Sequence, residues 1–84
     1  MTQNTLDRQT ILDTFYTALQ DTNPVVRAKA AEALGKLGDV TAIPTLLAQL
    51  TDETPLVRSS VARSLGEFGS ETILPALVQT LCQL

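Results

Sequence analysis

The sequence repeats itself at a spacing of 31 residues, and this period constrains the fold more than any other feature. When residues 21–51 are laid on residues 52–82 without a gap, 12 positions are identical. The identical pairs near the start of each copy are Asp21 and Asp52, Pro24 and Pro55, and Arg27 and Arg58. A fixed period of this length is typical of stacked arrays, in which each unit buries its apolar face against the next. The pattern therefore favours a binding surface over a catalytic pocket.

A longer helix in each copy is marked by apolar residues at spacings of three and four, which predict one buried helix face. In the first copy this helix runs from Pro24 to Leu37, with Asn23 as its N-cap and Gly38 as its left-handed stop. Proline suits the first helical position, where its missing N–H is not needed. The second copy has the same order, with Thr54 as cap, Pro55 at the start, Phe68 facing inward and Gly69 as stop.

Shorter helices alternate with the two long ones. One spans about residues 40–50, and residues 71–83 repeat it. Residues 6–20 read as a diverged first copy, because their apolar positions lie 31 residues before those of the 40–50 helix. The expected caps of the two later short helices are Asp39 and Ser70. No stretch alternates apolar and polar residues as a strand would, so an all-α fold of about five helices is predicted.

Three phrases of the repeat carry a resemblance to a known family. They are Asp-x-x-Pro-x-Val-Arg, Ala-x-x-Leu-Gly-x-Leu/Phe-Gly and Ile/Leu-Pro-x-Leu, in residues 21–50 and again in 52–81. Together they resemble HEAT repeats, most of all the short type of the phycobilisome lyase families. The resemblance implies an α-solenoid of stacked antiparallel helix pairs, with the Val-Arg helices on the concave side. It divides a single domain, 1–84, into a first repeat (about 5–38), a second repeat (about 39–69) and an unpaired helix (70–84).

The same resemblance assigns a structural role to the repeated aspartates and arginines. It implies a ladder of hydrogen bonds and ion pairs between neighbouring repeats, formed by Asp21, Arg27, Asp52 and Arg58. A carboxylate beside a helix N-terminus also meets the positive end of the helix dipole. A catalytic role for these pairs is the weaker interpretation, because nothing nucleophilic or metal-binding accompanies them.

The stripe opposite the buried face of each long helix is a candidate partner-binding surface. The spacings of four, three and four place its members on one face of each helix, and side by side when the repeats stack. The members are Val25, Lys29, Glu32, Lys36, Leu56, Ser60, Arg63 and Glu67. The alternative is that Glu32–Arg63 and Lys36–Glu67 are surface ion pairs between repeats, worth about 0–1 kcal/mol each. Exposed Val25 and Leu56 favour a contact surface.

The last helix presents an edge problem, because a repeat array needs polar caps at both ends. Its apolar residues exceed what the preceding helix pair can cover, so part of this face is expected to be exposed. The residues concerned are Leu74, Leu77, Val78, Leu81 and Leu84. Two explanations follow: self-association through this helix as a homodimer, or continuation of a longer repeat array.

The residues that are missing exclude much chemistry. The chain has no histidine, which removes the commonest general base and metal ligand, and a lone Cys82 cannot build a thiolate metal site. A net charge of −3 argues against nucleic-acid binding, and no run approaches the roughly 20 apolar residues of a membrane span. We therefore expect no catalytic residues, no cofactor and no metal. The single cysteine and the absence of a signal-peptide pattern predict a cytoplasmic protein.

These observations favour a non-enzymatic scaffold that binds a protein partner along its concave helix face. The resemblance adds one enzymatic alternative, a phycobilin lyase subunit or another phycobilisome-associated factor. A third interpretation is a fragment of a larger HEAT-repeat regulatory protein. The same type of repeat serves many unrelated partners, so the repeat itself does not choose among the three.

Overall fold

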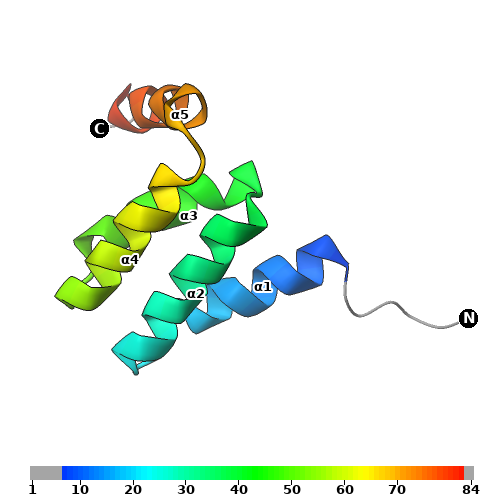
Figure 1. Ribbon diagram of the computed structural model, residues 1–84, viewed down its shortest axis with the longest axis vertical. Coiled ribbons are helices and arrows are strands. Elements are labelled where there is room, and N and C mark those ends of the chain that lie inside the picture. The colour runs from blue at the N-terminus through cyan, green and yellow to red at the C-terminus, as the bar shows by residue number, and fades with distance from the viewer. Residues whose placement is uncertain (1–6, 83–84) are drawn as a thin grey trace, which may run out of the picture.

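The computed structural model describes residues 7–82. Within them the chain is all α-helical, with no strand (Figure 1). The helices are α1 (Arg8–Ala18), α2 (Pro24–Leu37), α3 (Ile43–Ala48), α4 (Pro55–Gly66) and α5 (Ser70–Cys82), and α3 is flanked by the 3-10 turns Val40–Ala42 and Gln49–Thr51. The fold class is therefore as expected from the repeat, an all-α solenoid-like stack.

The first long helix begins and ends where its sequence predicts. The Asn23 side chain accepts a hydrogen bond from the Val25 N–H at 2.8 Å, and Pro24 takes the first helical position. Gly38 ends α2 in the left-handed region, with φ of 72°. Such a φ carries a steric cost for residues with a Cβ, which explains a glycine at this position.

The second long helix departs from the expectation at both ends. Thr54 precedes α4 but caps it with no side-chain hydrogen bond, because its hydroxyl accepts one from Arg27 instead. The helix ends at Gly66, so Phe68 lies in the turn rather than in the helix, half-buried against the core. Gly69, with φ of 81°, supplies the left-handed residue further along the loop.

The sequence predicted one continuous helix over about residues 40–50, but the structure divides this segment. Its α-helical part starts only at Ile43, and Pro44 lies in its first turn, where a missing N–H leaves no bond unmade. A 3-10 turn precedes it, and Asp39 caps that turn by accepting from the Thr41 N–H at 2.9 Å. In the last helix Ser70 is the first helical residue and not the cap.

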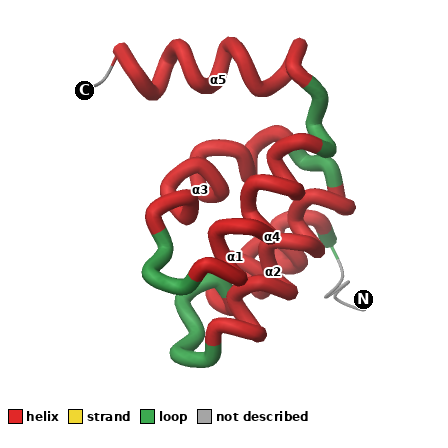
Figure 2. Tube along the Cα trace, turned by 60° about the vertical axis from the view of Figure 1, so that its left-hand side comes forward, coloured by secondary structure: helices red, strands yellow, loops and turns green. Residues whose placement is uncertain are grey.

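The helices form two layers, with α2 and α4 side by side in one and α1 and α3 in the other (Figures 1 and 2). The α2–α4 contact is the most extensive between any two helices described. Small side chains allow this close approach, and the Ser64 hydroxyl donates to the Ala31 carbonyl at 2.6 Å across the contact. The buried core is Leu12, Leu19, Ala28, Ala30, Ala31, Leu34, Ala42, Ile43, Leu46, Val57, Val61 and Leu65.

The last helix lies across one end of this stack, against α3 and the end of α4 (Figure 2). Ile73 and Ala76 pack against the core, and Leu77 is half-buried. Leu74 and Val78 remain 57% and 59% exposed. A helix that meets its neighbours on one side only leaves its other apolar face in water.

Candidate interaction surface

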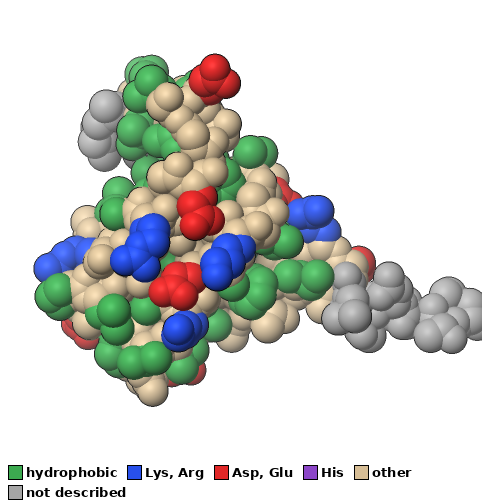
Figure 3. Space-filling model, in the orientation of Figure 1, with side chains coloured by type: hydrophobic (Ala, Val, Ile, Leu, Met, Phe, Trp, Pro, Cys, Tyr) green, Lys and Arg blue, Asp and Glu red, His purple; other side chains and the backbone are tan. Residues whose placement is uncertain are grey.

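The stripes of the two long helices meet at a hollow of about 170 Å³. It is lined by Glu32, Lys36, Arg63, Ser64 and Glu67. Figure 3 shows positive and negative side chains gathered over the face on which α2 and α4 lie in Figure 1. Three charged side chains of α2 and α4, and that of Glu67 directly after α4, therefore line one small depression.

Two small residues, Gly35 and Ser64, let α2 and α4 approach closely beside the hollow. A Cβ added to Gly35 would lie 2.7 Å from the Cβ of Ser64, closer than real Cβ contacts. Ser64 also lines the hollow, next to the long side chains of Lys36 and Arg63.

Most of the predicted stripe is at the surface. Lys29, Lys36, Arg63 and Glu67 are exposed, Glu32 is half-buried, and about half the surface of Val25 and of Leu56 meets solvent.

Ser60 is placed differently from the prediction, since only 2% of its surface is exposed. The equivalent residue of the first repeat, Lys29, is exposed because none of the described helices packs against that face of α2. Ser60 is covered because α2 occupies that place beside α4. The 31-residue period equates two positions whose neighbours differ, so Ser60 does not belong to the exposed stripe.

The charges of the hollow are not paired across it. The Lys29 Nζ lies 3.9 Å from the Glu32 carboxylate, but this contact joins residues three apart on one helix. In the described part of the chain no ion pair or hydrogen bond joins Glu32 to Arg63, or Lys36 to Glu67. These side chains therefore keep their bonding capacity for other groups.

A second polar cluster links the loops that precede α2 and α4. The Arg27 guanidinium binds the Asp52 carboxylate with two hydrogen bonds, from Nε at 2.9 Å and from Nη2 at 3.2 Å. Its Nη1 donates to the Asp21 carbonyl at 2.7 Å, and its Nη2 also donates to the Thr54 hydroxyl. Only 9% of Arg27 is exposed. A bidentate, nearly buried pair of this kind fixes one repeat against the next.

The other members of the predicted ladder make different contacts. The Asp21 carboxylate accepts from the Asn23 N–H at 2.8 Å and shapes its own loop. Arg58 is exposed, and its Nη1 donates to the Asp52 carbonyl at 2.7 Å. The hydrogen bond from the Thr54 N–H, followed by the bond from Arg27, holds the pKa of Asp52 below its ordinary value.

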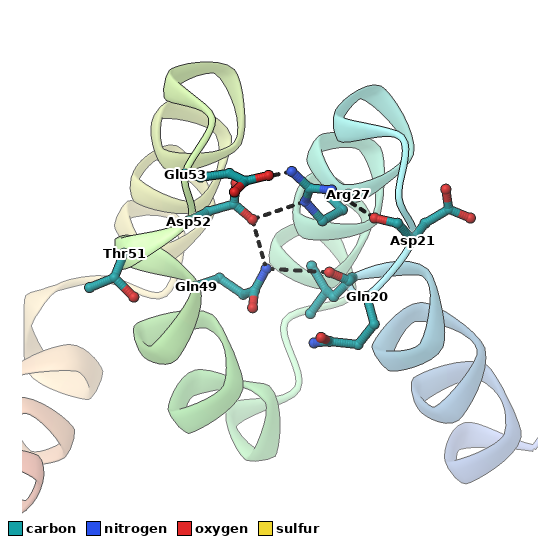
Figure 4. A pocket seen from close by; sticks show the side chains of 8 residues that line it. Gln20, Asp21, Arg27, Gln49, Thr51, Asp52 and Glu53 are labelled. Carbon is teal, nitrogen blue, oxygen red and sulfur yellow. Dashed lines mark hydrogen bonds and ion pairs between the residues drawn. The ribbon is translucent and has the colours of Figure 1, made fainter.

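Figure 4 shows the open space of about 370 Å³ beside this cluster. Gln49 lies in it and donates from Nε2 to the Leu19 carbonyl and to the Asp52 carboxylate, at 3.4 and 3.5 Å. Sequence reasoning missed Gln49 and the contact of Thr54 with Arg27, because neither residue occurs at the equivalent position of the other copy. Arg27, Asp52 and Gln49 bind one another in this space and link the two repeats, which supports a structural role for these three residues.

The predicted self-association edge lies partly outside the described residues. Leu74 and Val78 are exposed and Leu77 is half-buried, whereas the side chain of Leu81 and the whole of Leu84 are not described. Cys82 is exposed at the end of α5, although free cysteine is commonly buried. It is exposed because α5 contacts the stack along one side only.

Residues 7–82 hold no cluster of three or more histidine, cysteine, aspartate or glutamate side chains arranged to bind a metal ion. Among the helices described, none combines the length and the apolar character that crossing a membrane requires.

A family model for HEAT repeats matches residues 12–83, which is most of the chain. The antiparallel helices, the side-by-side long helices and the arginine–aspartate link define a helical-repeat protein, and the match places it within that class. The chain belongs to the HEAT-repeat family. A search of curated proteins found no match. The resemblance to the phycobilisome lyase type stays a prediction.

Proposed function

We propose that this protein is a non-enzymatic interaction module that binds a protein partner on the face formed by α2 and α4. HEAT repeats commonly mediate protein–protein interaction, and the chain belongs to this family. The observation that carries the proposal is the hollow between the two helices, where charged side chains of both signs lie without partners across it.

The chemistry of this face defines the kind of partner that fits. Exposed Val25 and Leu56 lie about two to three turns before the charged residues of the hollow and offer apolar contact area. Burying such groups contributes about 25 cal/mol per Å² of apolar surface. Lys36 and Arg63 can donate hydrogen bonds to carboxylates of a partner, and Glu32 and Glu67 can accept them from its donors. A partner surface with a region of mixed charge and a small apolar patch at one end of it meets all of these requirements.

The proposal is tested by inverting the charge pattern without changing the net charge. The variant exchanges the signs of four residues, Lys29→Glu, Glu32→Lys, Arg63→Glu and Glu67→Arg. Three of the four are exposed and Glu32 is half-buried, so circular dichroism and the melting temperature should match the wild type within a few degrees.

Wild type and variant are then used as baits in extracts of the source cells, and the retained proteins are quantified by mass spectrometry. A matched control, Gln9→Asp with Asp13→Gln, rearranges charge on the exposed face of α1. A protein partner of the α2–α4 face is retained by the wild type and the control and lost from the charge-inverted bait. Equal retention by all three baits contradicts the proposal.

Self-association through α5 is a second proposal, supported by the exposure of Leu74 and Val78. Light scattering after size exclusion over a dilution series measures it directly. A stable dimer that is lost in Leu74→Ser with Val78→Ser supports this interface, and a monomer at every concentration contradicts it. The α2–α4 face remains available in either case.

We do not extend the proposal to a phycobilin lyase. The hollow of about 170 Å³ is below the volume of about 300–1,000 Å³ that small-molecule sites usually have. The larger space beside Arg27 holds the hydrogen-bonded side chains of Arg27, Asp52 and Gln49, which link the two repeats. A cytoplasmic location, expected from the sequence, stays a prediction.

A further inference from the structure

One face of α2 is covered by α4. The equivalent face of α4, 31 residues later in the sequence, is not covered in the same way. On α2 this face consists of Arg27, Ala28, Ala31 and Gly35, all buried. The equivalent residues of α4, one period later, are Arg58, Ser59, Ala62 and Gly66, all exposed. We name these four residues the open α4 face. The covered face of α2 shows what a helix needs in order to dock on such a surface.

Each face has a glycine at the equivalent position. The space next to Gly35 is occupied by Ser64, whereas the space next to Gly66 is empty. A Cβ at Gly35 would collide with Ser64 of the covering helix, whereas a Cβ at Gly66 would meet nothing within 4 Å. The backbone of α4 is therefore accessible at the point where the backbone of α2 receives its neighbour.

The arginines provide an independent observation. The Nη1 atoms of Arg27 and Arg58 make the same contact, a hydrogen bond of 2.7 Å to the carbonyl of the preceding loop aspartate. This bond orients each guanidinium. Arg27 then directs Nε and Nη2 at the carboxylate of Asp52. Arg58 holds the same orientation, and no carboxylate of the described residues pairs with it.

The chain itself does not supply that carboxylate at the equivalent position. Asp52 lies 25 residues after Arg27, and the residue 25 after Arg58 is Gln83. At this position of the repeat the sequence therefore provides no aspartate equivalent to Asp52.

The occupant is a single helix rather than a second helix pair. By sequence α5 is the counterpart of α3, and it contacts α3 and α4. The place next to α3 at this end of the stack is therefore already taken by α5. The open α4 face lacks only the counterpart of α4.

We propose that the open α4 face binds one helix of a partner protein, with an aspartate or glutamate just before its first turn meeting Arg58. A small or hydroxyl-bearing residue of the same helix lies against Gly66, as Ser64 lies against Gly35. This surface is distinct from the hollow between α2 and α4, and the proposal does not depend on the function proposed above.

The probe is a peptide with the sequence of residues 52–66, because this segment already docks on the covered face of α2. Such a short helix is marginal in isolation, so binding is expected to be weak and is followed by NMR titration of isotope-labelled protein. The NMR signals of Arg58, Ala62, Gly66 and their neighbours should change position as the peptide is added. A peptide with Asn in place of its first residue, Asp52, should bind about threefold to tenfold more weakly.

Two protein variants decide the outcome. Gly66→Leu fills the open face at a position with free space, so it should fold and should weaken peptide binding by at least about tenfold. Lys29→Glu with Arg63→Glu alters the hollow and should leave peptide binding unchanged. Equal binding by Gly66→Leu would overturn the proposal.

The location of the shifts separates the alternatives. Movement around Gly35 means that the peptide displaces α4, which contradicts docking on the open face. Concentration-dependent shifts at Gly66 without peptide assign the face to a second copy of the chain, which contradicts the proposed occupant.

Discussion

The contact between Gly35 and Ser64 provides a quantitative test of how the two long helices pack. In Gly35→Ala the new Cβ would lie 2.7 Å from the Ser64 Cβ and 2.9 Å from its Cα. Because the Cα belongs to the backbone of α4, rotation of a side chain cannot relieve the collision, and the two helices must separate. Overpacking of this kind costs about 1–3 kcal/mol.

The higher helix propensity of alanine offsets about 1 kcal/mol of that cost. The free energy of unfolding should therefore fall by up to about 2 kcal/mol, which lowers the melting temperature by up to about 15 °C for a domain of this size. Gly66→Ala is the matched control, since the added methyl meets nothing within 4 Å. It should raise the melting temperature by a few degrees.

A double-mutant cycle links the effect to the contact. Ser64→Gly removes the Cβ that Gly35→Ala strikes, so the alanine should cost less in that background, with a coupling energy of about 1 kcal/mol or more. Thermal unfolding followed by circular dichroism measures all four proteins. If the substitutions at Gly35 and Gly66 shift the melting temperature equally, or if the coupling is zero, the packing argument is wrong.

Three further predictions concern the Arg27–Asp52 ion pair, the stability of the protein at acidic pH and the exposed apolar residues of α5. Arg27→Gln should lower the free energy of unfolding by about 3 kcal/mol in urea, because it leaves the Asp52 carboxylate nearly buried without its partner; the same change at exposed Arg58 should cost less than about 1 kcal/mol. The lowered pKa of Asp52 means that its contribution is complete above about pH 4 and is lost as the pH falls through the lower folded-state value. Stability should therefore decline from about pH 4 towards pH 2, and Asp52→Asn should flatten that decline. Leu74→Ser with Val78→Ser should change the free energy of unfolding by about 0.5 kcal/mol or less, and should reduce aggregation measured by light scattering at high concentration.

The fold was predictable because the repeat specifies the same local structure twice. Asn23, Pro24 and Gly38 each act through local backbone chemistry, and α2 begins and ends where they require. The short helices were less predictable, since the expected 40–50 helix consists of a short α-helix between two 3-10 turns, whereas the equivalent α5 is continuous although it contains Pro75. That division depends on hydrogen-bond choices that an apolar pattern does not record.

The candidate surface was predictable only in part, because a period equates positions whose neighbours differ. Lys29 and Ser60 are equivalent in sequence, but α2 covers the serine and nothing covers the lysine. Arg27 and Arg58 differ for the same reason. Only the arrangement of neighbours along the stack shows which face of each helix is open, and the sequence of one repeat does not contain it.

The central claim is that a protein partner binds the face formed by α2 and α4. The most direct measurement is NMR mapping of isotope-labelled protein with the partner captured by wild type and lost from the charge-inverted variant. The account predicts that the shifted signals cluster on Glu32, Lys36, Arg63 and Glu67 around the hollow. Signals that cluster instead on Leu74 and Val78 of α5, or on α1, would contradict it.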